Sequence, residues 1–402
     1  MASTKRYILN YKQTHMEHEH AVGLITEANK HIKSPGYEPD EEALLKTLNH
    51  FDAPGFTAVS LTQEEAENLA QHGEIESIVE DFPVYMPELK EPETAVKKEP
   101  ADQIPWNIAM VKADKAWDMG YTGKNVKIAL IDSGIDSTKP ELKEAVKGGI
   151  SYSGTIATKD WQDKLGHGTL CAGIIAARKG PSGVVGVAPD AELYAVKITD
   201  TRNISSFEKV LNGMKWVYNQ NKAGVNIQVV SMSVGFTSGQ ISDTPGGMDS
   251  LKCIVKSLLE QDCVIVAAVG NYLKPGIVEY PAHLASVMGT GAVGKDGKPW
   301  EESTYIKGKN LVAICAPGVE IYPGWECVKN FDHSGTSFAC PHVSGAAALA
   351  IESLNQQNKP VEPDSIQTIL DDGATDISVP GVDPQTGAGL LDCEKSIQVA
   401  TS

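Results

Sequence analysis

The stretch Val126-Lys127-Ile128-Ala129-Leu130-Ile131, followed directly by Asp132-Ser133-Gly134, decides the fold of this chain. Its apolar residues are nearly continuous instead of alternating with polar ones, which is typical of a strand buried on both faces of a sheet. Helix-forming segments, notably 206–220 and 251–261, separate most of the similar runs further along. This alternation predicts an α/β fold with a parallel sheet between two layers of helices. The other apolar runs lie at 192–198, 227–231, 263–268, 286–292 and 311–316.

The size and composition of the chain fit one large domain and one smaller domain. It has 402 residues, of which 41% are hydrophobic and 22% charged, so it can bury a substantial core. No stretch approaches the length of a transmembrane helix, and we expect no membrane partner. The net charge is −17, and the three arginines lie far apart in the sequence, at positions 6, 178 and 202. This argues against a nucleic-acid partner, which requires clustered positive charge.

The cysteines predict a reducing environment. There are seven, none in a Cys-x-x-Cys pair, and several lie inside apolar runs, so reduced and buried thiols are expected. The segment from Met1 to Leu9 lacks the apolar core of a secretion signal. We therefore expect an intracellular, cytoplasmic location for the chain as written, and a secreted one if a signal peptide once preceded it.

The first 86 residues predict a small α+β domain. Thr62 and Glu65 form a capping box, which opens a helix that runs to about residue 71. Two halves of βαβ type in so short a segment predict a ferredoxin-like sandwich. The expected strands lie at 7–11, 56–61 and 75–79, and the other helix at 17–32.

A linker separates this domain from the rest. Residues 87–100 contain three prolines, seven charged residues and few apolar groups, which predicts an extended segment open to proteolysis. The chain is thus expected to consist of a first domain over 1–86, the linker, and a large domain over 101–402.

Three short glycine-rich blocks contain an acid, a base and a hydroxyl. Asp132 ends the first apolar run, His167 lies between two glycines, and Ser337 follows Gly335-Thr336. A hydroxyl is a poor nucleophile at neutral pH, so it needs a base within hydrogen-bond reach and an acid that holds the base. Each block alone has an ordinary reading as a strand-end carboxylate, a structural histidine or a helix cap. Together they indicate a serine protease.

The motifs Asp132-Ser133-Gly134, His167-Gly168-Thr169 and Gly335-Thr336-Ser337-Phe338-Ala339-Cys340-Pro341-His342 resemble those of the subtilisin-like (subtilase) serine proteases. The resemblance extends from about residue 104 to 391, and the order Asp, His, Ser is that of subtilisin itself. It implies a three-layer α/β catalytic domain with serine endopeptidase activity. By this resemblance Ser337 is the nucleophile, His167 the general base and then acid, and Asp132 the group that orients and stabilises the imidazolium.

The resemblance also implies an oxyanion hole and a substrate cleft. The segment Ala267-Ala268-Val269-Gly270-Asn271 matches the oxyanion-hole segment, which gives the Asn271 side-chain amide and the Ser337 backbone N–H as donors. A protein or peptide substrate would pair as an extra strand between two segments of the enzyme. The residues implied for these two segments are Asn203, Ile204 and Ser205 in one and Ser233, Val234 and Gly235 in the other.

The pocket for the side chain before the scissile bond (P1) departs from the family. Its walls would include Ala268 and Gly270, and its far end would be Glu279, where many relatives have glycine or another small residue. A carboxylate there would favour lysine or arginine at P1, because an opposite charge offsets its desolvation. The alternative is that Glu279 faces solvent or pairs locally.

A second departure concerns calcium, since the chemistry itself needs no cofactor. Subtilisins often have an asparagine ligand in the loop that here reads Arg178-Lys179-Gly180-Pro181-Ser182-Gly183, which has two positive charges and no carboxylate or amide. Asp102 and Glu141 roughly match other ligands of that site. A tight oxygen cage is therefore not expected there, although calcium elsewhere stays open. Cys171, four residues after His167, is expected beneath the histidine on the same helical face.

The first domain resembles a subtilase propeptide, which implies a zymogen that is blocked by its own propeptide and processes itself. Residues 80–85 would approach the cleft, and residues 87–100 are extra relative to the usual junction. Cleavage is expected near Tyr85-Met86, or after Lys97 or Lys98. Histidines in this domain could loosen the complex on acidification, with scattered exposed histidines as the alternative. They are His15, His18, His20, His31, His50 and His72.

Three other functions fit the sequence less well. An inactive subtilase could serve as a scaffold or peptide sensor, but the complete set of catalytic residues and Asn271 count against it. A peptide-transfer enzyme would pass the acyl group to an amine, and nothing in the sequence specifies a lid that excludes water. A nucleotide-binding domain would need a glycine-rich phosphate loop after the first strand, and Asp132-Ser133-Gly134 is not one.

Overall fold

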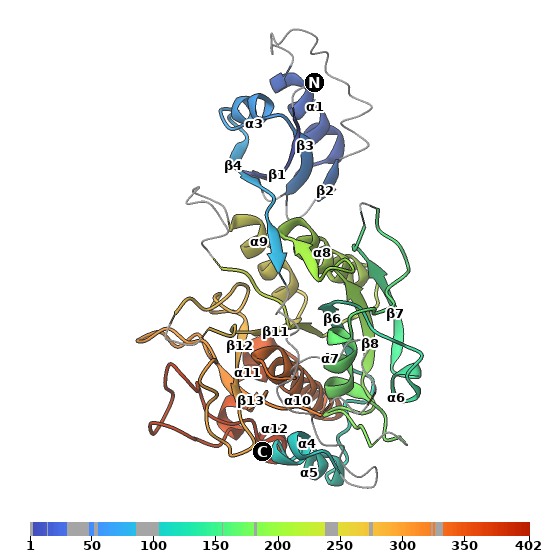
Figure 1. Cartoon of the computed structure of the whole chain (residues 1–402), viewed down its shortest axis with the longest axis vertical. Coiled ribbons are helices and arrows are strands. Elements are labelled where there is room, and N and C mark those ends of the chain that lie inside the picture. The colour runs from blue at the N-terminus through green and yellow to red at the C-terminus, as the bar shows by residue number, and fades with distance from the viewer. Residues whose placement is uncertain are drawn as a thin grey trace.

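A computed structural model describes most of the chain, and it places the N-terminal domain against one end of a larger α/β domain (Figure 1). Among the described residues, no helix is both long enough and apolar enough to cross a membrane. The expected linker at 87–100, Asp102 and His31 lie outside the described residues, as do the processing positions Met86, Lys97 and Lys98. The described residues are 3–13, 15–29, 48–51, 55–85, 104–154, 156–180, 183–237, 248–272, 276–322, 325 and 333–402.

The N-terminal domain has the β-α-β-β-α-β order of ferredoxin-like folds. Its antiparallel sheet has the order β2-β3-β1-β4. The capping box is present, since Glu65 N donates to Thr62 Oγ1 (3.3 Å) and Thr62 N donates to Glu65 Oε2 (2.6 Å). Strand β2 was not expected from the sequence. The elements are β1 (Lys5–Tyr11), α1 (His18–Asn29), β2 (Asn49–Phe51), β3 (Phe56–Leu61), α3 (Gln63–Leu69) and β4 (Ile75–Glu80).

The large domain is built on a parallel sheet in the order β13-β12-β11-β10-β6-β8-β7. All six apolar runs of the sequence form strands of this sheet. The edge strand β7 was not expected, because Val-Lys-Gly-Gly-Ile-Ser has too few apolar residues to predict a buried strand. The strands are β6 (Lys127–Asp132), β7 (Val146–Ser151), β8 (Glu192–Lys197), β10 (Val229–Met232), β11 (Val264–Ala268), β12 (Met288–Val293) and β13 (Ile314–Pro317).

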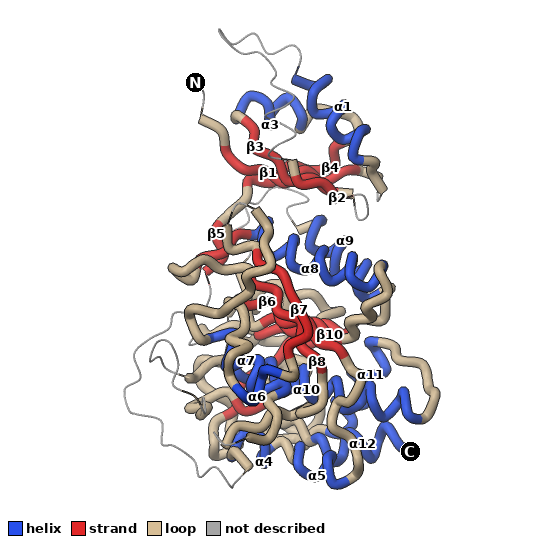
Figure 2. The backbone as a smooth tube through the Cα atoms, turned by 90° about the vertical axis from the view of Figure 1, so that its right-hand side faces the viewer, coloured by secondary structure: helices blue, strands red, loops and turns tan. Residues whose placement is uncertain are grey.

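Helices cover both faces of this sheet, which confirms the three-layer expectation (Figure 2). Along β6, Ile128 and Leu130 belong to the core on one face, and Ala129 and Ile131 to the core on the other. Residues of α7 (His167–Ala176), α10 (Thr336–Gln356), α5 (Ala113–Asp118), α11 (Pro363–Gly373) and α12 (Cys393–Thr401) share the first core. Those of α8 (Phe207–Lys222) and α9 (Asp249–Leu259) share the second. The short helices are α4 (Trp106–Met110) and α6 (Pro140–Lys143).

The strand order reverses beside β6. The chain continues from β6 to β7 and β8 on one side and then returns to β10 on the other. In parallel sheets ligands bind outside the carboxyl ends of the strands at such a point. Asp132 ends β6, Ser233 follows β10, and Asn271 lies just beyond β11, so the predicted site residues gather at this edge.

Candidate active site

Asp132 and His167 form a hydrogen-bonded pair that is closed off from solvent. His167 Nδ1 lies 2.8 Å from Asp132 Oδ1, and their side chains are 1% and 0% exposed. The same carboxylate oxygen accepts a hydrogen bond from Ser133 N (2.6 Å). A carboxylate at Nδ1 places the proton on that nitrogen, so Nε2 is left as the basic nitrogen of the ring. His167 Nε2 is buried and has no hydrogen-bond partner among the described residues.

The pKa of His167 is raised well above its ordinary value of 6.5. Burial opposes the charged imidazolium, but the adjacent Asp132 carboxylate outweighs this effect. Burial also raises the pKa of the Cys171 thiol, so this group is neutral near pH 7. The charge that favours the imidazolium therefore comes from Asp132.

Ser337 lies in the first turn of α10, which begins at Thr336. Pro341 is consequently inside the helix rather than in its first turn, and it has no N–H to donate to the carbonyl four residues earlier. That carbonyl, Ser337 O, instead accepts hydrogen bonds from Ser233 Oγ (2.7 Å) and Cys171 Sγ (3.4 Å). The two hydrogen bonds that replace the missing helical bond thus connect the turn of Ser337 to α7 and to the residue that follows β10.

The Ser337 hydroxyl donates to Ser233 O at 3.3 Å, so in this structure it is not bonded to His167. Its neighbour Phe338 packs against the imidazole, with ring centroids 5.3 Å apart. Catalytic hydrogen bonds are often long or misaligned before substrate binds. Rotation about the Cα–Cβ bond of Ser337 is the motion that would redirect the hydroxyl.

Cys171 lies beneath the histidine, as the sequence predicted. Its Sγ is 4.0 Å from His167 Nδ1 and 3.6 Å from Ser233 Oγ. It is fully buried. With a raised pKa and no exposure, the thiol packs and donates weak hydrogen bonds but is not a second nucleophile.

The Asn271 side chain is held in one orientation by Thr336. Asn271 Oδ1 accepts from both Thr336 N and Thr336 Oγ1, each at 2.9 Å. Because the oxygen is occupied, the Nδ2 group turns toward Gly335, where an added Cβ would come within 3.1 Å of it. The amide is thus positioned as a donor beside the Ser337 turn, with space that a side chain at residue 335 would fill.

The first predicted substrate segment is already paired with a strand of this chain. Residues Ile204–Ser206 form β9, and Pro83–Tyr85 form the antiparallel β5 opposite it. Val84 faces Ser205 and Tyr85 faces Ile204 in this register. Asn203 precedes β9 with a left-handed backbone, φ 66°. The N-terminal part of the chain thus extends to an edge predicted for substrate (Figure 1).

The second predicted substrate segment follows β10. Val234 is buried, and the Ser233 side chain is directed at α10 rather than at a cleft. Among the described residues, β5 pairs with β9, and no pairing of β5 with this second segment is present.

Glu279 lies against the walls predicted for the P1 pocket. A Cβ on Gly235 would meet Glu279 Oε2 at 2.3 Å, and a Cβ on Gly270 would meet its Cγ and Cδ at 3.1 Å. Tyr272 Oη donates to Glu279 Oε1 at 2.8 Å. Burial raises the pKa of Glu279, and the tyrosine hydrogen bond partly opposes this. The carboxylate therefore sits between the two glycines that wall the predicted pocket, and Ala268 ends the strand leading to it.

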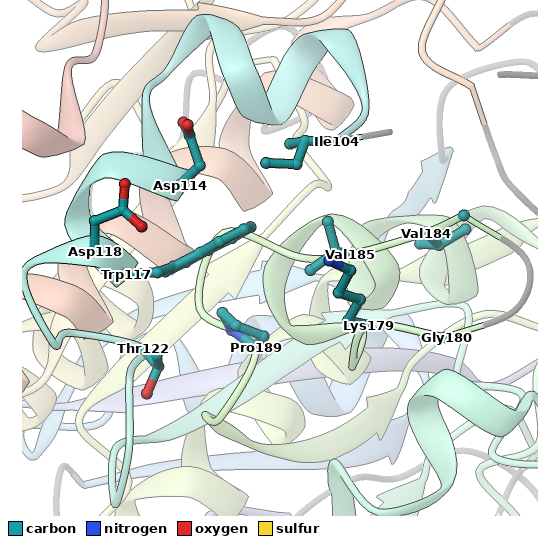
Figure 3. Close-up of a pocket in the computed structure, with 11 residues that line it drawn as sticks. Ile104, Asp114, Trp117, Asp118, Thr122, Lys179, Gly180, Val184, Val185 and Pro189 are labelled. Atoms are coloured by element: carbon teal, nitrogen blue, oxygen red, sulfur yellow. The ribbon is translucent and has the colours of Figure 1, made fainter. Parts of the chain in front are cut away.

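The loop that begins at Arg178, where a tight calcium cage is not expected, has its arginine bound by backbone carbonyl groups. The Arg178 guanidinium donates to the carbonyl oxygens of Pro189, Ala191 and Ala176. Trp325 Nε1 donates to Glu141 Oε2 at 2.8 Å. A pocket beside this loop has an apolar wall that includes Trp117, with two carboxylates on one side and Lys179 on the other (Figure 3). Residues predicted for catalysis do not line it.

Three residues that contribute to the site were not predicted. Thr336 belongs to a motif already singled out, but its contact with Asn271 depends on two distant segments meeting. Tyr272 is the residue after Asn271, and only the fold brings it to Glu279. Asp163 is a buried carboxylate near His167, and a single aspartate in a loop has no signal in one sequence.

A buried aspartate–histidine pair next to a serine in the first turn of a helix, on a three-layer parallel sheet, defines a serine hydrolase of the α/β class. Residues 123–389 match the subtilase family. Subtilisin E of Bacillus subtilis (strain 168) is 31% identical over 353 residues, which cover 87% of this chain and 81% of that protein. An alkaline protease of Alkalihalobacillus alcalophilus is 33% identical over 356 residues, which cover 88% of this chain and 82% of that protein. A subtilisin of Bacillus pumilus is 37% identical over 254 residues, which cover 62% of this chain and 86% of that protein.

The chain belongs to the subtilase family and is a serine endopeptidase that acts on proteins or peptides.

Proposed function

We propose that Ser337 is the nucleophile of this endopeptidase, His167 its general base and acid, and Asp132 the orienting carboxylate. The observation that carries this assignment is the buried 2.8 Å Asp132–His167 hydrogen bond beside the turn of Ser337. Ser337 Oγ attacks the carbonyl carbon of the scissile bond while His167 Nε2 takes its proton. The imidazolium then protonates the leaving amine, and water releases the acyl group from Ser337 by the same steps in reverse order.

The oxyanion of the tetrahedral intermediate would be bound by Asn271 Nδ2 and the backbone N–H of Ser337. Thr336 supports this role because it occupies Asn271 Oδ1 and leaves the amide nitrogen to donate. A donor fixed before the reaction stabilises developing charge without reorganising. Loss of such a donor costs about 10²–10³ in kcat, a value that comes from subtilisin itself.

The assignment is tested with the purified chain and a generic peptide substrate. Ser337→Ala should abolish peptide hydrolysis while keeping the fold, as judged by circular dichroism. A Ser337→Ala protein as active as its parent would refute the assignment of the nucleophile.

We propose further that the chain is a zymogen: residues 1–86 form an inhibitor domain, 87–100 a linker with the processing site, and 101–402 the catalytic domain. The pairing of β5 with β9 supports this, because an inhibitor strand there excludes a substrate strand. Phe82 stacks on Phe207 with centroids 4.9 Å apart and meets the edge of Phe236 at 5.5 Å.

Polar contacts between the two domains support the same proposal. Arg6 donates twice to the Glu208 carboxylate, each bond at 2.7 Å, and the Arg6 side chain is only 24% exposed. Asp81 Oδ1 accepts from Glu208 N (2.9 Å) at the start of α8. Bidentate, partly buried contacts of this kind are the strong ones among ion pairs. They hold β1 and the turn between β4 and β5 onto the catalytic domain.

Self-processing is tested by mass spectrometry of the active chain and of Ser337→Ala after parallel incubation. The active chain should lose its N-terminal part near Tyr85 or after Lys97 or Lys98, and the variant should stay intact. Both chains remaining intact, with the parent active as purified, would contradict the zymogen proposal. The new N-terminal residue identifies the bond cleaved.

We propose that Glu279 selects lysine or arginine at P1. Its carboxylate lies between the predicted pocket walls, where a cationic side chain would offset its desolvation. The Tyr272 hydroxyl holds one carboxylate oxygen, and the other is available to the substrate. Matched P1 Lys, Phe and Leu peptides test this: Glu279→Gln should lower kcat/KM for Lys alone. Tyr272→Phe should lower it less, and no basic preference in the parent would refute the proposal.

We propose that the loop at 178–183 does not depend on calcium. Calcium requires six to eight oxygen ligands, whereas here carbonyl groups bind the Arg178 guanidinium and Glu141 accepts from Trp325. The residues present therefore do not fit this ion. Thermal unfolding with and without a chelator tests the proposal, and a large loss of stability with chelator would contradict it. We also propose an intracellular location for the chain. The free thiols at all described cysteines support it, because a reducing environment keeps thiols unpaired.

A further inference from the structure

Asp163 is a buried carboxylate surrounded by donors. It is 3% exposed, and its two oxygens accept five hydrogen bonds from four residues. Oδ1 accepts from Ser133 Oγ (3.0 Å), Leu165 N (2.9 Å) and Gly166 N (3.0 Å). Oδ2 accepts from Thr169 N (3.0 Å) and Thr169 Oγ1 (2.6 Å). A carboxylate can accept this many bonds, and a neutral amide of the same shape cannot, because it has only one acceptor oxygen.

These donors lie on both sides of His167 and next to Asp132. Gly166 and Thr169 flank His167 at the start of α7, so their bonds to Asp163 fix the first turn that carries the imidazole. Ser133 also accepts from Gly168 N (2.9 Å) and donates its own N–H to Asp132 Oδ1. One carboxylate therefore joins the strand end of Asp132 to the helix start of His167.

The N-cap residue of α7 makes no side-chain hydrogen bond, and side chains outside the helix bind its first N–H groups instead. Its N-cap residue is Gly166, which has a left-handed backbone (φ 100°) and no side chain. Ser133 Oγ accepts a hydrogen bond from Gly168 N, and Asp163 Oδ2 accepts one from Thr169 N. Two N–H groups of the first turn that have no partner within the helix are thereby satisfied.

As a carboxylate bound to the first turn of α7, Asp163 would also act electrostatically on the base. His167 is the first residue of a ten-residue helix, and the positive end of the helix dipole disfavours an imidazolium there. A carboxylate at the same end opposes that effect. The other groups facing this cluster are Asp132 and Cys171 beside His167, and Lys197 of β8, whose Nζ donates to Gln162 O next to Asp163.

We propose that Asp163 is a positioning residue for catalysis: its carboxylate sets the distance between Asp132 and His167 and offsets the helix dipole at the base. The inference rests on the proposed roles of Asp132, His167 and Ser337. It does not place Asp163 in contact with substrate.

The test compares Asp163→Asn with the parent enzyme on a peptide substrate, with enzyme concentration set by active-site titration. We expect kcat to fall by about 10- to 100-fold, because a misplacement of the order of 1 Å has this effect. KM should stay within about twofold, since the proposed substrate segments do not contact Asp163. The acid limb of kcat/KM should move to lower pH by roughly half a unit as the charge is lost.

Asp383→Asn is the matched control. Asp383 is a buried carboxylate that accepts bonds from Gln385 N (2.8 Å), Thr386 N (3.1 Å) and the Thr386 hydroxyl, and it contacts none of the catalytic residues. It should lose stability but keep both kcat and the pH profile of the parent. Equal kcat and equal profiles for Asp163→Asn and Asp383→Asn would overturn the proposal.

If Asp163→Asn does not fold, Ser133→Ala decides. It removes the hydroxyl that joins Asp163 and Gly168 to the strand end at Asp132 but leaves the charge, so kcat should fall while the acid limb stays in place. An unchanged kcat in folded Ser133→Ala would overturn the positioning role. Should Ser337→Ala be as active as the parent, the proposed function itself fails, a result that the Asp163 variants cannot produce.

Discussion

His342 makes the catalytic domain sensitive to acid, and the size of the effect follows from its surroundings. It is fully buried on α10, one turn beyond Ser337. His342 Nδ1 lies 2.8 Å from Phe338 O and Nε2 lies 2.8 Å from Asn107 Nδ2. The carbonyl can only accept and the amide nitrogen can only donate, so the ring is neutral with its proton on Nδ1. Burial lowers the pKa of His342 from 6.5 to about 4.

Between pH 6.5 and pH 4, His342 therefore binds a proton in the unfolded chain but not in the folded state. Stability from this group is fully present above pH 6.5 and is lost as the pH falls toward 4. Between pH 7 and pH 5 the difference in proton binding removes about 2 kcal/mol, and the full shift corresponds to about 3 kcal/mol. A loss of 2 kcal/mol is a large part of the stability of a typical domain.

Urea unfolding at pH 7 and pH 5 measures this loss. The background is Ser337→Ala, which prevents self-digestion, with and without His342→Gln. The glutamine variant should start less stable at pH 7 but lose about 2 kcal/mol less on acidification. Because His167 and the other histidines are present in both proteins, their contributions cancel in the comparison. The same pH dependence with and without His342→Gln would refute the reasoning.

Three further results are expected. Asp132→Asn should lower kcat by about 10⁴-fold in a peptide assay, because the imidazole loses its orienting charge; a loss below tenfold would contradict the role of the pair. In the parent, the acid limb of kcat/KM should lie above pH 6.5, since Asp132 raises the pKa of His167 and the base must be neutral. Arg6→Ala should speed maturation on gels, because Glu208 is left partly buried without its cation, at a cost of about 2–5 kcal/mol to the domain contact; slower maturation would count against an inhibitory contact.

The sequence predicts those parts of the fold that depend on local pattern. Each long apolar run became a parallel strand because its residues face two cores, as Ile128 and Ala129 do on β6. Strands β2 and β7 were not predicted because β2 is short and β7 is glycine-rich. They are stabilised by pairing with neighbouring strands and not by their own composition.

The site divides in the same way. Asp132, His167, Ser337 and Asn271 lie in motifs that one sequence can reveal. Their supporting contacts could not be predicted, because they join segments far apart in the chain: Asp163 meets Ser133 across 30 residues and Thr336 meets Asn271 across 65. The pairing of hydrogen-bond donors and acceptors depends on tertiary packing. A single aspartate or threonine in a loop belongs to no periodic sequence pattern that would predict its partner.

If substrate pairs with β9 as proposed, this edge limits which polypeptides the enzyme can cut. The backbone groups there pair with an extended strand, as they do with Pro83–Tyr85. A segment inside a helix or a closed sheet has already used its own N–H and C=O groups and cannot offer them to β9. Proteolysis would therefore follow local unfolding of the target, with the P1 side chain selecting among bonds that are already exposed. Under that proposal, the enzyme's fastest substrates should be damaged, unassembled or newly made proteins, which expose unfolded segments, rather than proteins richest in any one residue.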